Sequence, residues 1–117
     1  MDDENDDYIL RTQGHVTVVR LKVENLTGTG DIHRIQDALN GLVDGGVRRL
    51  VVDFKYVKYA ASAALGMLLG LQKKLSACSG HLVLSRVDNI SDLLDVSRTR
   101  RMFQIATDPK EAVKLLS

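Results

Sequence analysis

A short apolar run between two helix-like patterns is the feature that most constrains the fold of this chain. Residues 50–52 are Leu-Val-Val, and Asp53 and Phe54 follow directly. A mostly apolar strand of this length is typical of the centre of a sheet, where both faces are covered. On either side, apolar residues recur at three- and four-residue steps, which predicts helices that cross over the sheet. We therefore expect residues 48–54 to form a central strand of an α/β sheet.

The remaining segments alternate between strand and helix patterns after an opening hairpin. β-Branched residues on both sides of Gln13-Gly14 predict the hairpin. The later strands are expected to be parallel, because helices connect them. The order β-β-α-β-α-β-α-β-α predicts an α/β fold with a single mixed β-sheet of about five strands and about four helices packed against it. Strands are expected over residues 8–12, 15–23, 48–54, 81–86 and 101–105, and helices begin at Asp31, after Tyr59, at Ile90 and at Thr107.

Residues with known preferences mark the helix boundaries. Asp31 is expected to cap the first helix, which Gly45-Gly46 ends. Asn89 or Ser91 is expected to cap the short third helix. Residues 107–109, Thr-Asp-Pro, are typical of a helix start, because a capping residue precedes a proline in the first turn.

Charge is distributed unevenly along the 117 residues. The formal net charge is +1, from 16 Lys and Arg against 15 Asp and Glu, which does not favour nucleic acid or membranes as partners. Five of the acids lie in the first seven residues, so the remainder carries 16 basic against 10 acidic residues, or +6. We expect residues 1–7 to be an acidic, disordered leader and residues 8–117 to be a single domain. The alternative is that the leader docks on a basic surface as an autoinhibitory arm.

Few residues are arranged for catalysis or metal binding. His15, His33 and His81 share no helical step with another metal-ligating residue, so no metal or cofactor is expected. No nucleophile is paired with a base, and Cys78 lies near an expected helix C-terminus, where the dipole disfavours a thiolate. One cysteine and no apolar signal segment favour a reducing, cytoplasmic setting, and no apolar run approaches the length of a membrane span. The sequence therefore favours a binding protein over an enzyme.

Two segments resemble ligand-binding loops without matching one. Gly28, Thr29 and Gly30 precede a helix, as in phosphate-binding loops, but His33 stands where the dinucleotide motif has a glycine. A flexible strand-to-helix turn explains these glycines as well. Asp53 ends an apolar strand, where α/β sheets form sites, yet no second carboxylate lies near it in sequence. The alternative is that Asp53 accepts hydrogen bonds from amides of the following loop.

Ser62 stands among alanines at the point where the second long helix begins. Small side chains permit close approach of a partner, and the free amides of a first helical turn favour negative charge. A phosphate on Ser62 would gain from the helix dipole and present about two negative charges to a partner. The alternative is that Ser62 is only the N-cap.

This segment and those around it resemble the STAS family of anti-sigma-factor antagonist domains. The family pattern is an apolar strand ending in Asp, a short loop, and Asp-Ser-Ser-Gly-Leu-Gly entering a helix. Downstream likenesses are a glycine-led strand, a short helix, a last strand and a final helix. The resemblance covers nearly all of residues 8–116. The matching residues are Leu50, Val51, Val52, Asp53, Val57, Ser62, Leu65, Gly66 and Leu68 in the motif, and residues 80–84, 93–94, 102–105, 108 and 111–113 downstream.

The motif departs from the family at three positions. Ala61 replaces the motif Asp, Ala63 replaces the second serine, which is the family's usual phosphoacceptor, and Ala64 replaces the next glycine. The resemblance implies a domain that binds a partner around Ser62 and is not switched off by phosphorylation at position 63. Ala63 would then resemble a permanently dephosphorylated, binding-competent state, unless Ser62 takes the phosphate.

The resemblance implies a non-enzymatic regulatory domain that binds an anti-sigma factor or a switch-type serine kinase. A signalling-assembly scaffold, built by self-association, is a variant of this hypothesis. The alternative is a small-ligand module, for a nucleotide or a lipid, that uses the Ser62 helix start together with Gly28, Thr29 and Gly30. The expected partner-binding residues are Lys55, Tyr56, Lys58, Tyr59, Ala61, Ser62, Ala63, Ala64 and Met67.

Three arginines, Arg98, Arg100 and Arg101, lie between the short helix and the last expected strand. They are either solvated surface residues or a docking patch for an acidic partner or for the chain's own leader. Direct binding to nucleic acid is not expected, because none of the 3 Tyr and 2 Phe interleaves with these arginines.

Overall fold

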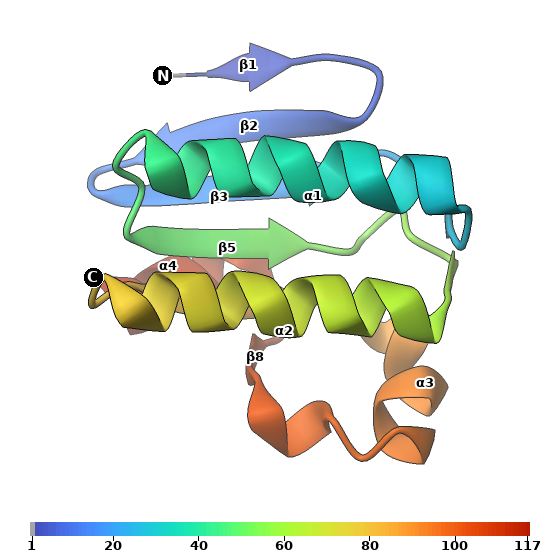
Figure 1. Ribbon diagram of the computed structural model, residues 1–117. Helices are drawn as coiled ribbons and strands as arrows, with labels where there is room; N and C mark the ends of the chain where they lie inside the picture. The colour runs from blue at the N-terminus through green and yellow to red at the C-terminus, as the bar shows by residue number, and fades with distance from the viewer. Residues whose placement is uncertain (1) are drawn as a thin grey trace.

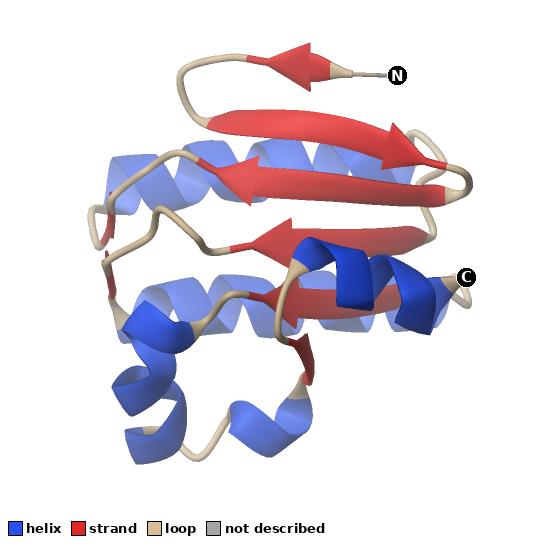
Figure 2. Ribbon diagram, turned by 180° about the vertical axis from the view of Figure 1, so that it is seen from behind, coloured by secondary structure: helices blue, strands red, loops and turns tan. Residues whose placement is uncertain are grey.

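The computed structural model describes residues 2–117, in which a six-stranded sheet has helices on both faces (Figure 1, Figure 2). A second, two-stranded sheet pairs β4 (Asn25–Leu26) with β6 (Tyr59–Ala60). The strands of the large sheet, in spatial order, are β1 (Asp3–Glu4), β2 (Tyr8–Gln13), β3 (Val16–Leu21), β5 (Arg49–Asp53), β7 (His81–Ser85) and β8 (Gln104–Ala106). The helices are α1 (Thr29–Asp44), α2 (Ser62–Ala77), α3 (Ser91–Val96) and α4 (Pro109–Leu116), with 3₁₀ turns η1 (Asp88–Ile90) and η2 (Arg100–Met102).

The large sheet is mixed, as expected. Strands β2 and β3 form an antiparallel hairpin whose turn contains Gly14 at a φ of 61°, a conformation that glycine adopts without strain. Strands β3, β5, β7 and β8 are parallel neighbours. Strand β5 lies between β3 and β7 and is buried over Leu50–Asp53, which confirms the central position predicted from its apolar run. The α/β class is confirmed, and the extra strands raise the count above the expected five.

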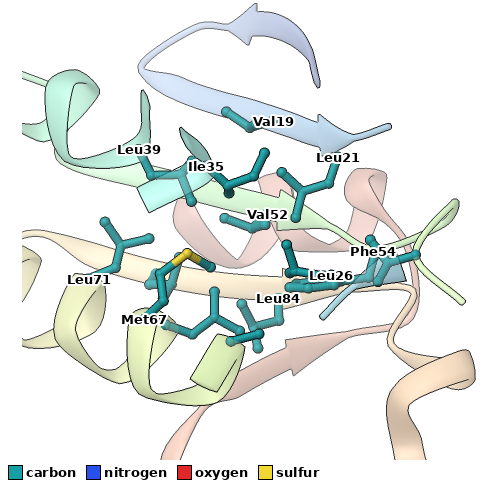
Figure 3. Close-up of a cluster of buried hydrophobic side chains, with 14 of the residues drawn as sticks. Val19, Leu21, Leu26, Ile35, Leu39, Val52, Phe54, Met67, Leu71 and Leu84 are labelled. Atoms are coloured by element: carbon teal, nitrogen blue, oxygen red, sulfur yellow. The ribbon is translucent and has the colours of Figure 1, made fainter. Parts of the chain in front are cut away.

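Two hydrophobic clusters cover the two faces of the sheet. Helices α1 and α2 lie side by side over one face (Figure 1), and α4 lies over the other (Figure 2). Alternation along β3 sends Val19 to the α1/α2 cluster and Val18 to the α4 cluster, because successive side chains of a strand point to opposite faces. Figure 3 shows the larger cluster, in which Ile35 of α1 and Leu71 of α2 pack over the sheet.

Residues 2–7 of the acidic leader lie along the edge of the large sheet and include a short strand. Strand β1 pairs antiparallel with β2, and its Glu4 forms an ion pair with Lys22 at 3.2 Å. Asp7 forms an ion pair with Arg34 of α1 at 3.2 Å, and the hydrogen bonds that the Arg34 guanidinium donates to Asp7 and to Asp31 raise its pKa above the ordinary value. Without β1, strand β2 would present an unpaired edge. The backbone pairing of β1 with β2 and the ion pairs to Lys22 and Arg34 offset the repulsion among the acids.

Several boundaries differ from expectation. Helix α1 begins at Thr29 with Gly28 at the N-cap, and Asp31 lies inside the first turn, where it pairs with Arg34 instead of capping. Helix α3 continues directly from η1, and neither Asn89 nor Ser91 makes a side-chain cap bond. Helix α4 begins as predicted, since the Asp108 side chain accepts a hydrogen bond from the backbone amide of Glu111 at 2.8 Å.

The last strand is shorter than residues 101–105 and begins at Gln104. Residues 100–102 instead form the turn η2, which hydrogen bonds connect to α3 and α2. The Arg100 guanidinium donates to the Ser91 carbonyl at 3.2 Å, and the Gln72 amide donates to the Met102 carbonyl at 2.6 Å. Across residues 2–117, every helix is too short or too polar to span a membrane.

Candidate functional site

The small β4–β6 sheet brings the starts of α1 and α2 to the same end of the molecule. The two strands are parallel, with Leu26 opposite Ala60, and each is followed within three residues by a long helix. Residues 28–30 and residues 61–63 therefore lie near each other, although the sequence separates them by about thirty positions. The two sequence-predicted sites, one for a ligand and one for a partner, belong to one surface.

A shallow hollow of about 260 Å³ lies between the two helix starts. It is lined by Thr29 from the predicted ligand site and by Ala63 and Met67 from the predicted partner site. Sequence reasoning missed its other lining residues, because they come from α1, α2 and the turn before α1, which only the β4–β6 pairing brings together. A signal existed: consecutive right-handed crossovers place the starts of successive helices at the same end of a sheet. The missed residues are Thr27, Ile32, His33, Gln36 and Gly66.

Ser62 is exposed and is the first residue of α2. The N-cap is Ala61, whose φ of −89° and ψ of 162° are extended, and no side chain of the described chain caps this helix. The interpretation of Ser62 as the N-cap is therefore wrong: its backbone is already helical, so its hydroxyl is not placed to accept from the next turn. Ser62 and the exposed Ala63 leave the first-turn amides of α2 without a side-chain acceptor among residues 2–117.

The loop before α2 carries exposed aromatic and basic side chains. Tyr56 is 42% exposed and Tyr59 is 64% exposed. The Lys55 ammonium lies 5.5 Å from the centre of the Tyr56 ring, within the range of a cation–π contact, and Lys58 pairs with Glu24 at 3.6 Å. This loop forms one side of the Ser62 surface, which we define as Lys55, Tyr56, Lys58, Tyr59, Ala61, Ser62 and Ala63.

Two of the expected partner-binding residues are buried, although Met67 also lines the hollow between α1 and α2. Ala64 is 1% exposed and Met67 is 5% exposed, and both belong to the larger hydrophobic cluster. Met67 points from α2 toward the sheet in Figure 3. Helical periodicity is the reason, because residues 64, 67, 68 and 71 share the face that packs on the sheet while residues 62, 63 and 66 face away from it.

Asp53 is fully buried beneath the loop and is held by side chains of neighbouring strands. The Arg20 Nε donates to its Oδ2 at 2.7 Å, and the Ser85 hydroxyl donates to its Oδ1 at 3.0 Å. The Arg86 Nε lies 3.4 Å from the same Oδ1 without a hydrogen bond of good geometry. Sequence reasoning expected loop amides as the partners and missed these groups, because strand register, which pairs Arg20 with Asp53 and Asp53 with Ser85, is a tertiary property.

The Asp53 cluster connects the sheet to the loop of the Ser62 surface. The Arg20 guanidinium that binds Asp53 also lies 6.0 Å from the centre of the Tyr56 ring. Phe54, which follows Asp53, is 1% exposed, and its amide donates to the Ser85 carbonyl at 2.9 Å. These contacts fix both the direction in which the chain leaves β5 and the position of the Tyr56 ring.

The arginine cluster and the leader lie at opposite edges of the sheet. Strand β1 is at one edge, whereas residues 98–101 precede β8 at the other edge (Figure 1). The leader carboxylates pair with Lys22 and Arg34. The idea that the leader docks on Arg98 and its neighbours is therefore wrong for this structure. Within residues 2–117, no three His, Cys, Asp or Glu side chains gather as metal ligands.

The mixed sheet, with the starts of α1 and α2 at one end, defines an α/β domain, and comparisons with known proteins assign its family. The family model described as Mlab, STAS domain matches residues 10–106. The chain therefore belongs to the STAS domain family. BtrV of Bordetella bronchiseptica, provisionally named an anti-sigma factor antagonist, is 25% identical over 91 residues, which are 77% of this chain and 78% of BtrV.

Solved structures share the fold. A Thermotoga maritima protein, also provisionally named an anti-sigma factor antagonist, superposes with a TM-score of 0.79 at 15% identity and covers 92% of both chains. An antagonist from Mycobacterium paratuberculosis gives 0.77 at 17% identity, over 92% of this chain and 91% of the other. The Bacillus cell fate determinant SpoIIAA, in its phosphorylated form, gives 0.69 at 19% identity, over 94% and 99%. The family and fold are those of anti-sigma factor antagonists, which confirms the resemblance found in the sequence.

Proposed function

We propose that this chain is a non-enzymatic, cytoplasmic regulatory domain that binds an anti-sigma factor or a switch-type serine kinase through the Ser62 surface. The observation that carries the proposal is the start of α2, where Ser62 and Ala63 are exposed beside an exposed loop with two tyrosines. BtrV and the solved fold relatives support it, because they are named as antagonists of anti-sigma factors.

The chemistry of the Ser62 surface suits a protein partner. Tyrosine contributes a large contact area at low entropic cost and is enriched at the energetically dominant positions of interfaces. Small residues at the start of α2 allow a partner backbone to approach closely. The hollow of about 260 Å³ between α1 and α2 would receive one apolar side chain of the partner against Ala63 and Gly66. The surface is therefore suited to a rigid, shape-matched contact.

The switch expected of the family is altered in this chain. Position 63, which matches the usual phosphoacceptor, is an alanine and has no hydroxyl to accept a phosphate. SpoIIAA, which shares the fold, has been solved in both phosphorylated and unphosphorylated forms. A dianion at this interface would add repulsion and desolvation, so loss of the acceptor leaves the domain permanently able to bind, unless Ser62 is phosphorylated.

A binding measurement with matched variants tests the proposal. The kinase-type anti-sigma factors of the source organism are titrated with the purified chain by calorimetry. Ala63→Glu is expected to weaken binding by roughly tenfold or more, because it places a charge in the interface. Ala77→Glu, the same change at the exposed far end of α2, is the control and should bind normally. Equal binding by both variants, or no binding by the wild-type chain to any of these factors, would contradict the proposal.

A second candidate is a small-ligand module for a nucleotide or a lipid. It is favoured by the shared end of the molecule at which residues 28–30 and Ser62 lie, with two long helices directing their N-termini there. Thermal unfolding with ATP, GTP and short-chain phospholipids separates the two candidates. A rise in melting temperature with one of these ligands, together with no binding to an anti-sigma factor, would favour the ligand module.

A further inference from the structure

Exposed apolar side chains flank the arginine cluster. Val96 is 83% exposed at the end of α3, and Met102 is 51% exposed at the end of η2. Between them in the sequence lies Arg98, with a φ of 58°. Non-glycine residues adopt this left-handed conformation infrequently, and here it turns the chain between α3 and η2. Two apolar groups are thus presented to solvent on either side of a sharply turned basic segment.

One of the three arginines builds the local structure, and the other two are free. The Arg100 Nε donates to Asp95 at 2.7 Å, and its Nη2 donates to the Ser91 carbonyl at 3.2 Å. Arg98 and Arg101 are exposed, and within residues 2–117 their side chains have no partner. Arg100 therefore neutralises Asp95 and fixes the turn, which leaves two uncompensated positive charges.

A hollow of about 310 Å³ lies at this segment. The buried Leu94 forms its apolar floor, and the three arginines and Asp95 form its rim. The hollow is large enough for one apolar side chain, and the free guanidinium groups at its rim suit carboxylates on either side of that side chain.

Helix α3, which contributes Leu94 and Asp95 to the hollow, lies near the start of α2 (Figure 1, Figure 2). Turn η1, which leads into α3, packs against β6, the strand that precedes α2. Figures 1 and 2 both show α3 beside the start of α2. The Gln72 side chain of α2 holds η2 through the Met102 carbonyl at 2.6 Å. A partner bound at the start of α2 could therefore contact both areas without a large rearrangement.

We propose that the α3–η2 patch, defined as Val96, Arg98, Arg101 and Met102, binds an acidic segment of a protein partner whose apolar side chain enters the hollow above Leu94. The inference rests on the proposed function, since the same partner occupies the Ser62 surface. Charge complementarity carries the inference, because Arg98 and Arg101 are free cations and the one acid at the rim of the hollow, Asp95, is paired with Arg100. Nucleic acid fits less well, because exposed aliphatic groups flank the arginines and no aromatic side chain lines the hollow.

A peptide assay that contains no anti-sigma factor tests the patch by itself. A fluorescein-labelled peptide of repeated Leu-Glu-Glu units is titrated with the whole chain, and anisotropy gives Kd. The charge reversal Arg98→Glu/Arg101→Glu is expected to raise Kd by roughly tenfold. The matched control, Arg49→Glu/Lys110→Glu, removes the same charge at two exposed sites elsewhere and should change Kd by less than about twofold. A Leu-Gln-Gln peptide should bind weakly or not at all.

The position of binding and the role of the apolar groups provide further readouts. Amide chemical shifts should move at residues 94–102, and Val96→Ser should weaken the Leu-Glu-Glu peptide. Equal losses in the two charge-reversal variants, shifts confined to other residues, or tighter binding of a short DNA duplex than of the peptide would each overturn the inference. Binding of the peptide at the patch without binding of any anti-sigma factor would contradict only the proposed function. Normal binding of an anti-sigma factor by Arg98→Glu/Arg101→Glu would contradict only the patch.

Discussion

Arg20 and Asp53 face each other on neighbouring parallel strands, and the Arg20 Nε donates to the buried Asp53 carboxylate at 2.7 Å. The Asp53 side chain is fully buried, whereas that of Arg20 is 29% exposed. The carboxylate thus depends on Arg20 for charge compensation, while the guanidinium retains access to water. Because the same guanidinium lies against Tyr56, the pair links the centre of the sheet to the Ser62 surface.

Removal of Arg20 is expected to destabilise the fold. Arg20→Met leaves Asp53 buried with Ser85 and the poorly aligned Arg86, so the free energy of unfolding should fall by about 2–4 kcal/mol in urea titrations. Arg49→Met, at an exposed position of β5, should change it by less than about 0.5 kcal/mol. A similar small change for both variants would show that Asp53 does not need this partner.

Met67 is expected to behave as a core residue and Tyr59 as a surface residue. Met67→Ala should lower the free energy of unfolding by about 2–5 kcal/mol, because it leaves a cavity between α2 and the sheet. Tyr59→Ala should leave stability within about 0.5 kcal/mol and act only on partner binding. Urea unfolding of both variants checks the assignment, and an unchanged stability of Met67→Ala would show that Met67 is not a core residue.

Restoration of the missing hydroxyl should restore a phosphorylation site. We expect Ala63→Ser to gain one phosphate when incubated with ATP and a kinase-type anti-sigma factor that binds the chain, since position 63 is exposed in the first turn of α2. The wild-type chain should stay unmodified, and mass spectrometry gives both results. A phosphate on Ser62 of the wild-type chain would contradict the permanently binding state.

The leader is expected to protect the edge of the sheet more than it stabilises the fold. Deletion of residues 2–7 removes β1 and the ion pairs to Lys22 and Arg34, which are at least partly exposed and worth at most about 1 kcal/mol each. The unpaired β2 edge should then promote self-association, visible by size-exclusion chromatography at high concentration. Arg34→Gln keeps β1 but removes the ion pair of Arg34 with Asp7. This variant should elute at the same volume as the wild-type chain. Identical elution of the deletion variant and the full chain would contradict this role.

Much of the fold could be predicted because it depends on local patterns. The apolar run at 50–52 identified the central strand, Gly14 the hairpin turn, and Asp108 with Pro109 the start of the last helix. Each of these features depends on neighbouring residues alone, so the sequence shows them directly. The start of α2 was predicted correctly for the same reason, and its exposed residues Ser62 and Ala63 were among the expected partner-binding residues.

By itself, the sequence determined the α/β class, the order of the four helices and of the strands β2, β3, β5, β7 and β8, and the alanines at positions 61, 63 and 64 that depart from the family motif. Only the tertiary structure decided that Arg20 and Ser85 hold Asp53, that residues 28–30 lie beside Ser62, and that Met67 is buried. It also placed the acidic leader along β2 and away from Arg98. The physical reason is that register, crossover handedness and edge pairing join residues distant in sequence, whereas composition and periodicity describe only neighbours.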